Sequence, residues 1–145
     1  MIYYGVCALC LIASIMKKSK KHPKIKVESF GRYSKWKRGS KELPQILEFT
    51  NIIKSEEGNE FGMILHISSG KGARLDYCIQ HPPFTDADGN IEPDFTGTYH
   101  INTNDYKFFI GDCIWLPLED KVGEWVVSVE FEGKTVAERV FEVIK

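Results

Sequence analysis

The last part of the chain alternates between apolar and polar positions over two long runs. In the second run Phe141 and Val143 share a face, and a short turn separates it from the first. A period of two is the pattern of a half-buried strand, so 123–144 predicts a β-hairpin of long strands. Arg139 has the same parity as Phe141 and predicts a bulge or an edge position. The apolar residues of the first run are Trp125, Val127, Val129 and Phe131.

Shorter segments upstream show the same alternation. In the first of them Val27 and Tyr33 are expected on one face. Loops rich in Gly, Pro, Ser and acidic residues separate these segments. About seven short antiparallel strands with frequent turns predict an all-β chain of the immunoglobulin-like sandwich type. The upstream strands are expected at 27–34, 46–54, 61–67, 74–81, 98–103 and 106–115, the last with a bulge or turn near Gly111.

Composition supports one folded domain and shows an uneven charge distribution. The chain has 145 residues, of which 43% are hydrophobic and 27% charged, enough for a domain with its own core. Residues 1–41 carry 11 Lys and Arg against one acidic residue, whereas residues 42–145 carry 8 basic against 19 acidic residues. A basic arm is thus joined to an acidic body, which favours an anionic surface near the arm.

An uncharged apolar run at 2–16 precedes a cluster of lysines. As a helix it would span about 22 Å, short of the roughly 30 Å of a hydrocarbon core. Three interpretations stay open: a single-pass membrane anchor, a cleaved secretory signal, and an interfacial segment or truncated longer anchor. The anchor is favoured, because only Ser14 interrupts the run and a signal would need a basic start. The lysines expected to face lipid are Lys17, Lys18, Lys20 and Lys21.

The chain therefore divides into three predicted parts. These are an apolar anchor or signal segment at 1–17, a basic linker at 18–25 and a sandwich domain at 26–145. Because the lysines follow the apolar run, the positive-inside tendency places the domain on the cytoplasmic side of a membrane. Export of the domain is the alternative. The expected partners are the membrane, through the N-terminal segment, and an unknown protein, with the oligomeric state left open.

Few side chains suggest chemistry. The segment 35–41 is basic but has one aromatic residue, Trp36, so no nucleic-acid partner is predicted. The four histidines show no metal-ligand spacing, and the four cysteines lack the context of a redox motif. Cys78 and Cys113 are expected to be free thiols. No cofactor, metal or catalytic residue is therefore predicted.

The loop that follows the 74–81 segment is the most distinctive one. Two prolines end the strand, and acidic residues then alternate as in a calcium loop. Ile91 and Gly97 stand where such a loop needs Gly and Glu, so an Asp-Gly turn is favoured over a metal site. The candidate interaction loop consists of His81, Pro82, Pro83, Phe84, Asp86 and Asp88.

Three motifs, taken in order, resemble a known family. They are Glu60-Phe61-Gly62, then His81-Pro82-Pro83-Phe84-Thr85 with Asp88-Gly89, and finally Trp115-Leu116-Pro117 before Gly123-Glu124-Trp125. This order is similar to the bacterial family catalogued as domain of unknown function 3859, over about 27–145. The connection between Trp115 and Gly123 is longer here than in the family. The resemblance implies an immunoglobulin-like β-sandwich and no known activity, so it assigns no catalytic residue.

The sequence thus predicts a non-enzymatic binding or interaction module tethered at the membrane. An exported sandwich domain is one alternative. A small ligand-binding or enzymatic sandwich that uses the loop 82–94 is the other, and it requires a concave pocket with convergent polar groups at that loop.

Overall fold

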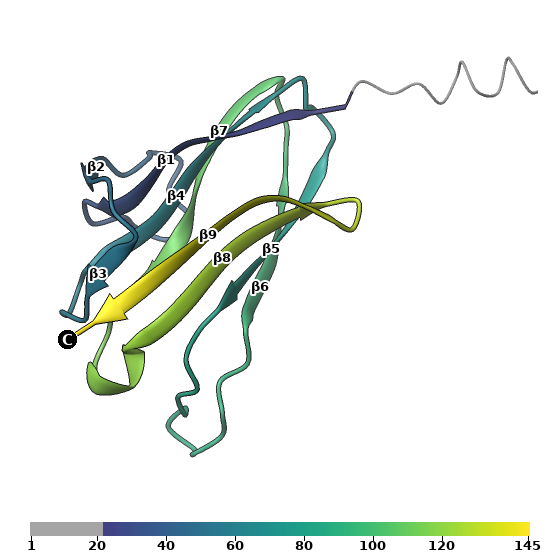
Figure 1. Cartoon of the computed structure of the whole chain (residues 1–145). Coiled ribbons are helices and arrows are strands. Elements are labelled where there is room, and N and C mark those ends of the chain that lie inside the picture. Colours follow the sequence, from purple (N-terminus) through teal and green to yellow (C-terminus); the bar gives the residue numbers. More distant parts are fainter. Residues whose placement is uncertain (1–21) are drawn as a thin grey trace, which may run out of the picture.

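The structure, a computed structural model, describes residues 22–145, which form strands and one short 3-10 helix (Figure 1). Within this part of the chain no helix is long and apolar enough to cross a membrane. The predicted anchor at 1–17 and its lysines lie outside the described residues. The elements are β1 (Lys24–Tyr33), β2 (Ile46–Glu48), β3 (Ile52–Lys54), β4 (Glu60–Ser68), β5 (Arg74–Gln80), β6 (Phe95–His100), β7 (Asp105–Cys113), η1 (Glu119–Lys121), β8 (Gly123–Phe131) and β9 (Lys134–Ile144).

The strands form two facing sheets, as the all-β prediction requires. One sheet has the order β2-β1-β4-β7 and the other β3-β9-β8-β5-β6 (Figure 1). The prediction of a purely antiparallel sandwich of about seven strands needs correction. The segment 46–54 crosses from one sheet to the other and so splits into β2 and β3, and β3 pairs with β9 in parallel. β1 also begins at Lys24, inside the segment predicted as linker.

The predicted hairpin at the end of the chain is confirmed as β8 and β9. The bulge lies between Val129 and Glu130, near the turn, and Arg139 is in regular register with Val127. Arg139 keeps its inward parity because its guanidinium lies 4.9 Å from the ring centre of Phe30 on the facing sheet. The predicted bulge is therefore absent, and a cation–π contact holds the side chain instead. The alternative of an edge position is confirmed, because β3 pairs with β9 only at 142–144 and leaves that side of β9 free at Arg139.

A bulge in β1 was not visible in the sequence pattern. Val27 pairs with Leu65 and Ser29 with Ile64, so Glu28 is an extra residue in the ladder. The two halves of β1 consequently present opposite parities to the core. Val27 packs against the main core, whereas Tyr33 belongs to a second cluster, so the prediction that these two share a face was wrong.

Three glycines lie side by side across β1, β4 and β7. Gly31 pairs with Gly62, and Gly62 pairs with Gly111. A Cβ atom on Gly111 would lie 2.0 Å from the Phe61 carbonyl oxygen, so the strands approach too closely for any side chain there. The β4–β7 register is continuous through Gly111, and the predicted bulge or turn at this residue was therefore wrong.

The main core fills the space between the sheets. Phe61 packs edge-on against Trp125, with ring centres 5.3 Å apart, and both side chains are fully buried. The Trp125 indole N–H donates to the Lys121 carbonyl oxygen at 2.8 Å, which satisfies its only polar atom. The second cluster lies on the outer face of the β2-β1-β4-β7 sheet and joins Tyr33, Ile64 and Phe109.

Candidate functional site

The sandwich is open along one side, where β7 and β6 are the terminal strands of their sheets. A cavity of about 280 Å³ lies at this opening and reaches Ile110 and Gly111 of β7. We call it the edge cleft. It is lined by Trp36, Arg38, Gly39, Tyr77, Ile79, Phe95, Tyr99, Phe109, Ile110, Gly111 and Asp112.

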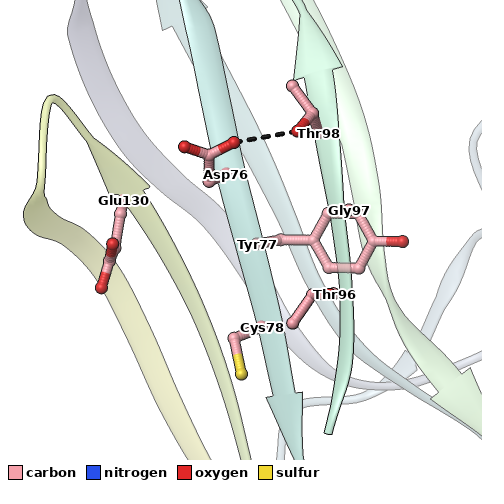
Figure 2. Close-up of a pocket in the computed structure, with 7 residues that line it drawn as sticks. All are labelled: Asp76, Tyr77, Cys78, Thr96, Gly97, Thr98 and Glu130. Carbon is pink, nitrogen blue, oxygen red and sulfur yellow. Dashed lines mark hydrogen bonds between the residues drawn. The ribbon is translucent and has the colours of Figure 1, made fainter.

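One wall of the edge cleft comes from the inner face of β5 and β6. Tyr77 and Tyr99 lie on this face, with ring centres 5.4 Å apart. Gly97 stands between them, and a Cβ atom there would meet the Tyr77 ring at 2.4 Å. The missing side chain lets Tyr77 lie flat over the edge strand (Figure 2). The Tyr99 hydroxyl donates to the Phe109 carbonyl oxygen at 3.3 Å, which ties β6 to the edge of β7.

The other wall comes from the loop 34–45, which covers the outer face of β7. The Trp36 ring packs edge-on against Phe109 at 5.2 Å, and its N–H donates to the Glu42 carbonyl oxygen at 2.7 Å. The Arg38 guanidinium lies 5.2 Å from the centre of the Trp36 ring. The basic loop of the sequence is thus held against the sheet by one aromatic anchor.

Arg38 connects two acidic residues, Glu60 at the start of β4 and Asp112 near the end of β7. Its Nη2 lies 2.5 Å from Glu60 Oε2 and 3.7 Å from Asp112 Oδ1. Burial raises the pKa of Glu60 above its usual value, and Arg38 opposes that rise. Burial also raises the pKa of Asp112, opposed by the Cys113 N–H and by Arg38. Asp112 shares parity with the core residue Ile110, so its carboxylate belongs to the inner side of the strand.

The backbone of β7 has a partly free edge along the cleft. In an antiparallel pair the N–H and C=O groups of alternate residues point toward the partner and away from it. The Phe109 oxygen bonds Tyr99, and the Asp105 oxygen accepts from Thr103, so the odd-numbered residues point away from β4. Lys107 and Gly111 share that parity. Their outward N–H and C=O groups have no hydrogen-bond partner within residues 22–145.

A second hollow, of about 330 Å³, lies on the outer face of β5, β6 and β8 (Figure 2). There the Thr98 hydroxyl donates to Asp76 Oδ1 at 2.9 Å. Burial, together with the carboxylates of Asp94 and Glu130, raises the pKa of the Cys78 thiol. The thiol is therefore kept in its protonated, poorly nucleophilic form.

The candidate interaction loop forms a closed turn beside the core. The His81 ring stacks on Phe84 with ring centres 4.2 Å apart, and the Phe84 side chain is buried. Asp86 Oδ1 accepts the N–H groups of Asp88 and Asn90 at 2.9 and 3.0 Å, so it closes its own turn. No group of three or more His, Cys, Asp and Glu in the described part of the chain could hold a metal ion.

The structure therefore brings together residues that the sequence left apart. Within the candidate interaction loop His81 contacts Phe84, whereas Pro83 and Asp88 are exposed. Trp36 was seen only as part of a basic loop, and Tyr77, Tyr99 and Asp112 only as strand residues. The one signal in the sequence is Asp112, a carboxylate at the parity of core residues.

Comparisons with known proteins agree with this fold. A family model described as "Domain of unknown function (DUF3859)" matches residues 21–143. No curated protein matches the sequence. The chain is similar to the crystal structure of an immunoglobulin-like protein from Pseudomonas aeruginosa, with a TM-score of 0.72 and 19% sequence identity, covering 87% of this chain and 99% of that one. At this identity the likeness shows an immunoglobulin-like fold and nothing of its activity.

Proposed function

The chain belongs to the family described as a domain of unknown function (DUF3859), and from that premise we propose that it is a non-enzymatic binding domain that pairs an extended segment of a partner protein along β7. The observation that carries the proposal is the free edge of this strand beside an aromatic cleft. Strand addition takes its affinity from backbone hydrogen bonds and its selectivity from pockets for alternate side chains.

The free edge offers groups that strand pairing needs. Lys107 and Gly111 each present an N–H and a C=O away from β4, and the Phe109 N–H shares their direction. These three residues occupy alternate positions, so a segment of about five residues would match them. β7 is nine residues long, whereas the edge strands β2 and β3 have three residues each and the edge strand β6 has six. It is therefore the better template.

The size and lining of the edge cleft favour a side chain over a free metabolite. Its volume of about 280 Å³ lies just below the roughly 300–1,000 Å³ of small-molecule sites. Aromatic rings from Trp36, Tyr77 and Tyr99 supply apolar walls, and Asp112 and Arg38 supply polar ends. Such a pocket suits one side chain of a bound strand.

The membrane tether remains part of the proposal. The apolar run at 2–16 and the lysines after it favour attachment with the domain on the cytoplasmic side. Recovery of the full-length protein in the membrane fraction is expected, and recovery wholly in the soluble fraction would remove the tether. A periplasmic reporter fused to the C-terminus is expected to be silent, whereas activity would favour the exported alternative.

A proline at the edge tests the strand pairing directly. The Lys107 N–H points away from β4, so Lys107→Pro removes an outward donor and keeps the ladder. Lys107→Ala is the matched control, because it also removes the Lys107–Glu28 ion pair, whose Nζ–Oε1 distance is 2.7 Å, but keeps the N–H.

In the assay, a library of displayed peptides is selected for binding to the full-length protein, and the enriched peptides are then tested one by one. Enriched peptides are expected to bind Lys107→Pro about tenfold more weakly than Lys107→Ala, the value of about one hydrogen bond. Circular dichroism spectra and urea midpoints of the two variants check that both are folded. Enriched peptides that bind both variants equally would refute pairing along β7.

A further inference from the structure

We propose that the edge cleft receives a Lys or Arg side chain of the bound segment, held by the Asp112 carboxylate and the surrounding aromatic rings. This inference rests on the proposed pairing along β7 and specifies the chemistry of the partner. Five observations lead to it: the charge balance at the end of β7, the Oδ2 atom of Asp112 that has no partner in the described chain, the aromatic lining, the parity of Asp112 and the acidity of the body.

The charges at the end of β7 do not balance. Two carboxylates, Glu60 and Asp112, share one guanidinium, that of Arg38. Arg38 lies 2.5 Å from Glu60 and 3.7 Å from Asp112, so its electrostatic attraction to Glu60 is the stronger of the two. One negative charge is thus left at the inner side of the strand, where a second cation would complete the set.

Asp112 has an acceptor to spare. Its Oδ1 accepts the Cys113 N–H at 2.8 Å and faces Arg38, and its Oδ2 has no hydrogen-bond partner among residues 22–145. No buried polar side-chain atom in this part of the chain lacks a partner, so Oδ2 must be reachable by solvent. The side chain is nevertheless only 19% exposed. A partly desolvated oxygen of this kind binds an ammonium or guanidinium more strongly than a surface carboxylate does.

The lining of the cleft suits a cation with an apolar stem. Ring faces carry negative potential and attract ammonium and guanidinium groups within about 6 Å of the ring centre. The Trp36 ring of one wall already has the Arg38 guanidinium 5.2 Å from its centre. Tyr77, Phe95 and Tyr99 line the opposite wall and are available to a cation. The methylene groups of a Lys or Arg side chain would lie along these rings while the charged end reaches Asp112.

Strand geometry delivers a side chain to this place. A segment paired along Phe109 and Gly111 sends alternate side chains to the inner and outer sides of the sheet. The inner positions lie beside Ile110 and Asp112, which share inward parity on β7. The outer side at Gly111 is filled, since a Cβ atom there would lie 2.8 Å from the Phe109 ring, so the inner side is the one that can receive a side chain.

The charge of the whole body favours the same class of partner. Residues 22–145 carry 20 acidic against 15 basic residues, although four of the basic residues lie on the loop beside the cleft: Lys35, Lys37, Arg38 and Lys41. An acidic surface raises the association rate of a basic segment, and salt weakens this effect. The net charge of the folded part therefore has the sign that attracts a basic segment, whereas the choice of side chain depends on the pocket.

The test uses three blocked pentapeptides of sequence Thr-Val-X-Val-Thr, in which X is Lys, norleucine or Glu. Binding to the full-length, isotopically labelled protein is followed at low salt by the amide signals of Lys107, Phe109 and Gly111. The Lys peptide is expected to bind at least about tenfold more tightly than the norleucine peptide, which has a similar stem and no charge. The Glu peptide is expected to bind most weakly.

Asp112→Asn provides the matched variant, because the amide keeps the shape and removes the charge. In this variant the affinities of the Lys and norleucine peptides are expected to become equal, while both peptides still bind. A Lys preference that survives Asp112→Asn, or equal binding of all three peptides to the unchanged protein, would overturn the cation pocket and leave strand pairing intact. Absence of any shift with all three peptides would instead refute the pairing itself.

Other occupants of the cleft would be recognised in the same experiment. If the Gly111 amide is already protected from exchange in the free full-length protein, a segment of this chain or a second copy fills the cleft. That result would also overturn the proposal. The expected result is fast exchange at Lys107 and Gly111 and slow exchange at Phe108 and Ile110, whose N–H groups face β4.

Discussion

Replacement of Lys121 will show whether the charge or the stem of this buried residue stabilises the fold. The Lys121 side chain is 1% exposed, and its Nζ lies 4.7 Å from the ring centre of Phe84 and 4.5 Å from that of Trp115. The ammonium also donates to the Pro117 carbonyl oxygen at 3.0 Å and to Asp120 Oδ1 at 2.6 Å. Lys121 thus joins the loop 81–94 to the connection before β8.

The magnitudes favour the stem. Lys121→Ala removes three buried methylene groups, about 0.8 kcal/mol each, and leaves a cavity under Phe84. We therefore expect a loss of about 2–4 kcal/mol. Lys121→Met keeps most of the stem. The Met variant loses the cation–π contacts and hydrogen bonds of the ammonium, but it also avoids the free-energy penalty of burying a charged group. Asp120, which loses its partner, is 32% exposed and can be hydrated. A change within about 1 kcal/mol is expected.

Urea unfolding of the full-length protein and both variants measures the difference. The slope of the transition should stay the same in all three, so that the midpoints report stability. Equal losses for Lys121→Met and Lys121→Ala would refute this reasoning and would assign the stabilisation to the ammonium. A Lys121→Met protein more stable than the natural one would be consistent with it.

Three further predictions address the sheet, the cleft and the outer face. Gly111→Ala is expected to lower the free energy of unfolding by about 4 kcal/mol or more, because its Cβ would lie 2.0 Å from the Phe61 carbonyl oxygen. Gly133→Ala, in open space at φ 77°, should lower it by about 1–2 kcal/mol, and thermal unfolding compares the two variants. Burial raises the pKa of Asp112, so the folded state binds the proton of this carboxyl more tightly than the unfolded state does. Its contribution to stability therefore falls as pH rises from the unfolded-state pKa of about 3.9 through the folded-state pKa, and Asp112→Asn should flatten that part of a profile of urea midpoint against pH. The Cys78 thiol, whose pKa is raised, should react with iodoacetamide at pH 8 more slowly than free cysteine, as followed by mass spectrometry.

The elements that could be predicted from the sequence are those with local patterns. The hairpin of β8 and β9 is evident because Trp125, Val127 and Phe141 recur at alternate positions and are all fully buried. The end of β5 follows from Pro82, which cannot donate to a ladder. In these places the pattern along the chain and the packing in space require the same residues.

The departures arise where a local pattern admits more than one structure. The extra residue Glu28 reverses which side chains of β1 face the main core. Val27 and Tyr33 are both apolar, so the sequence pattern fits a strand with this bulge and a strand without it. Gly111 in a strand indicated a bulge, but its neighbour Gly62 on β4 shows that it instead permits a close strand approach. Arg139 broke the alternation because its partner, Phe30, lies on the other sheet. None of these partners could be identified from spacing alone.

The edge cleft was missed for the same reason, since closure of the sandwich is what assembles it. Its charges also bear on why a long open strand is tolerated. Edge strands invite pairing with arbitrary chains, and inward-pointing charged residues are one way to prevent it. Asp112 places such a charge at the inner side of β7, and Arg38 places another across its end. Under the proposed function, an apolar or acidic strand would leave Asp112 without a partner, whereas a basic side chain would neutralise it. The feature that discourages unspecific pairing is then also the feature that selects the partner.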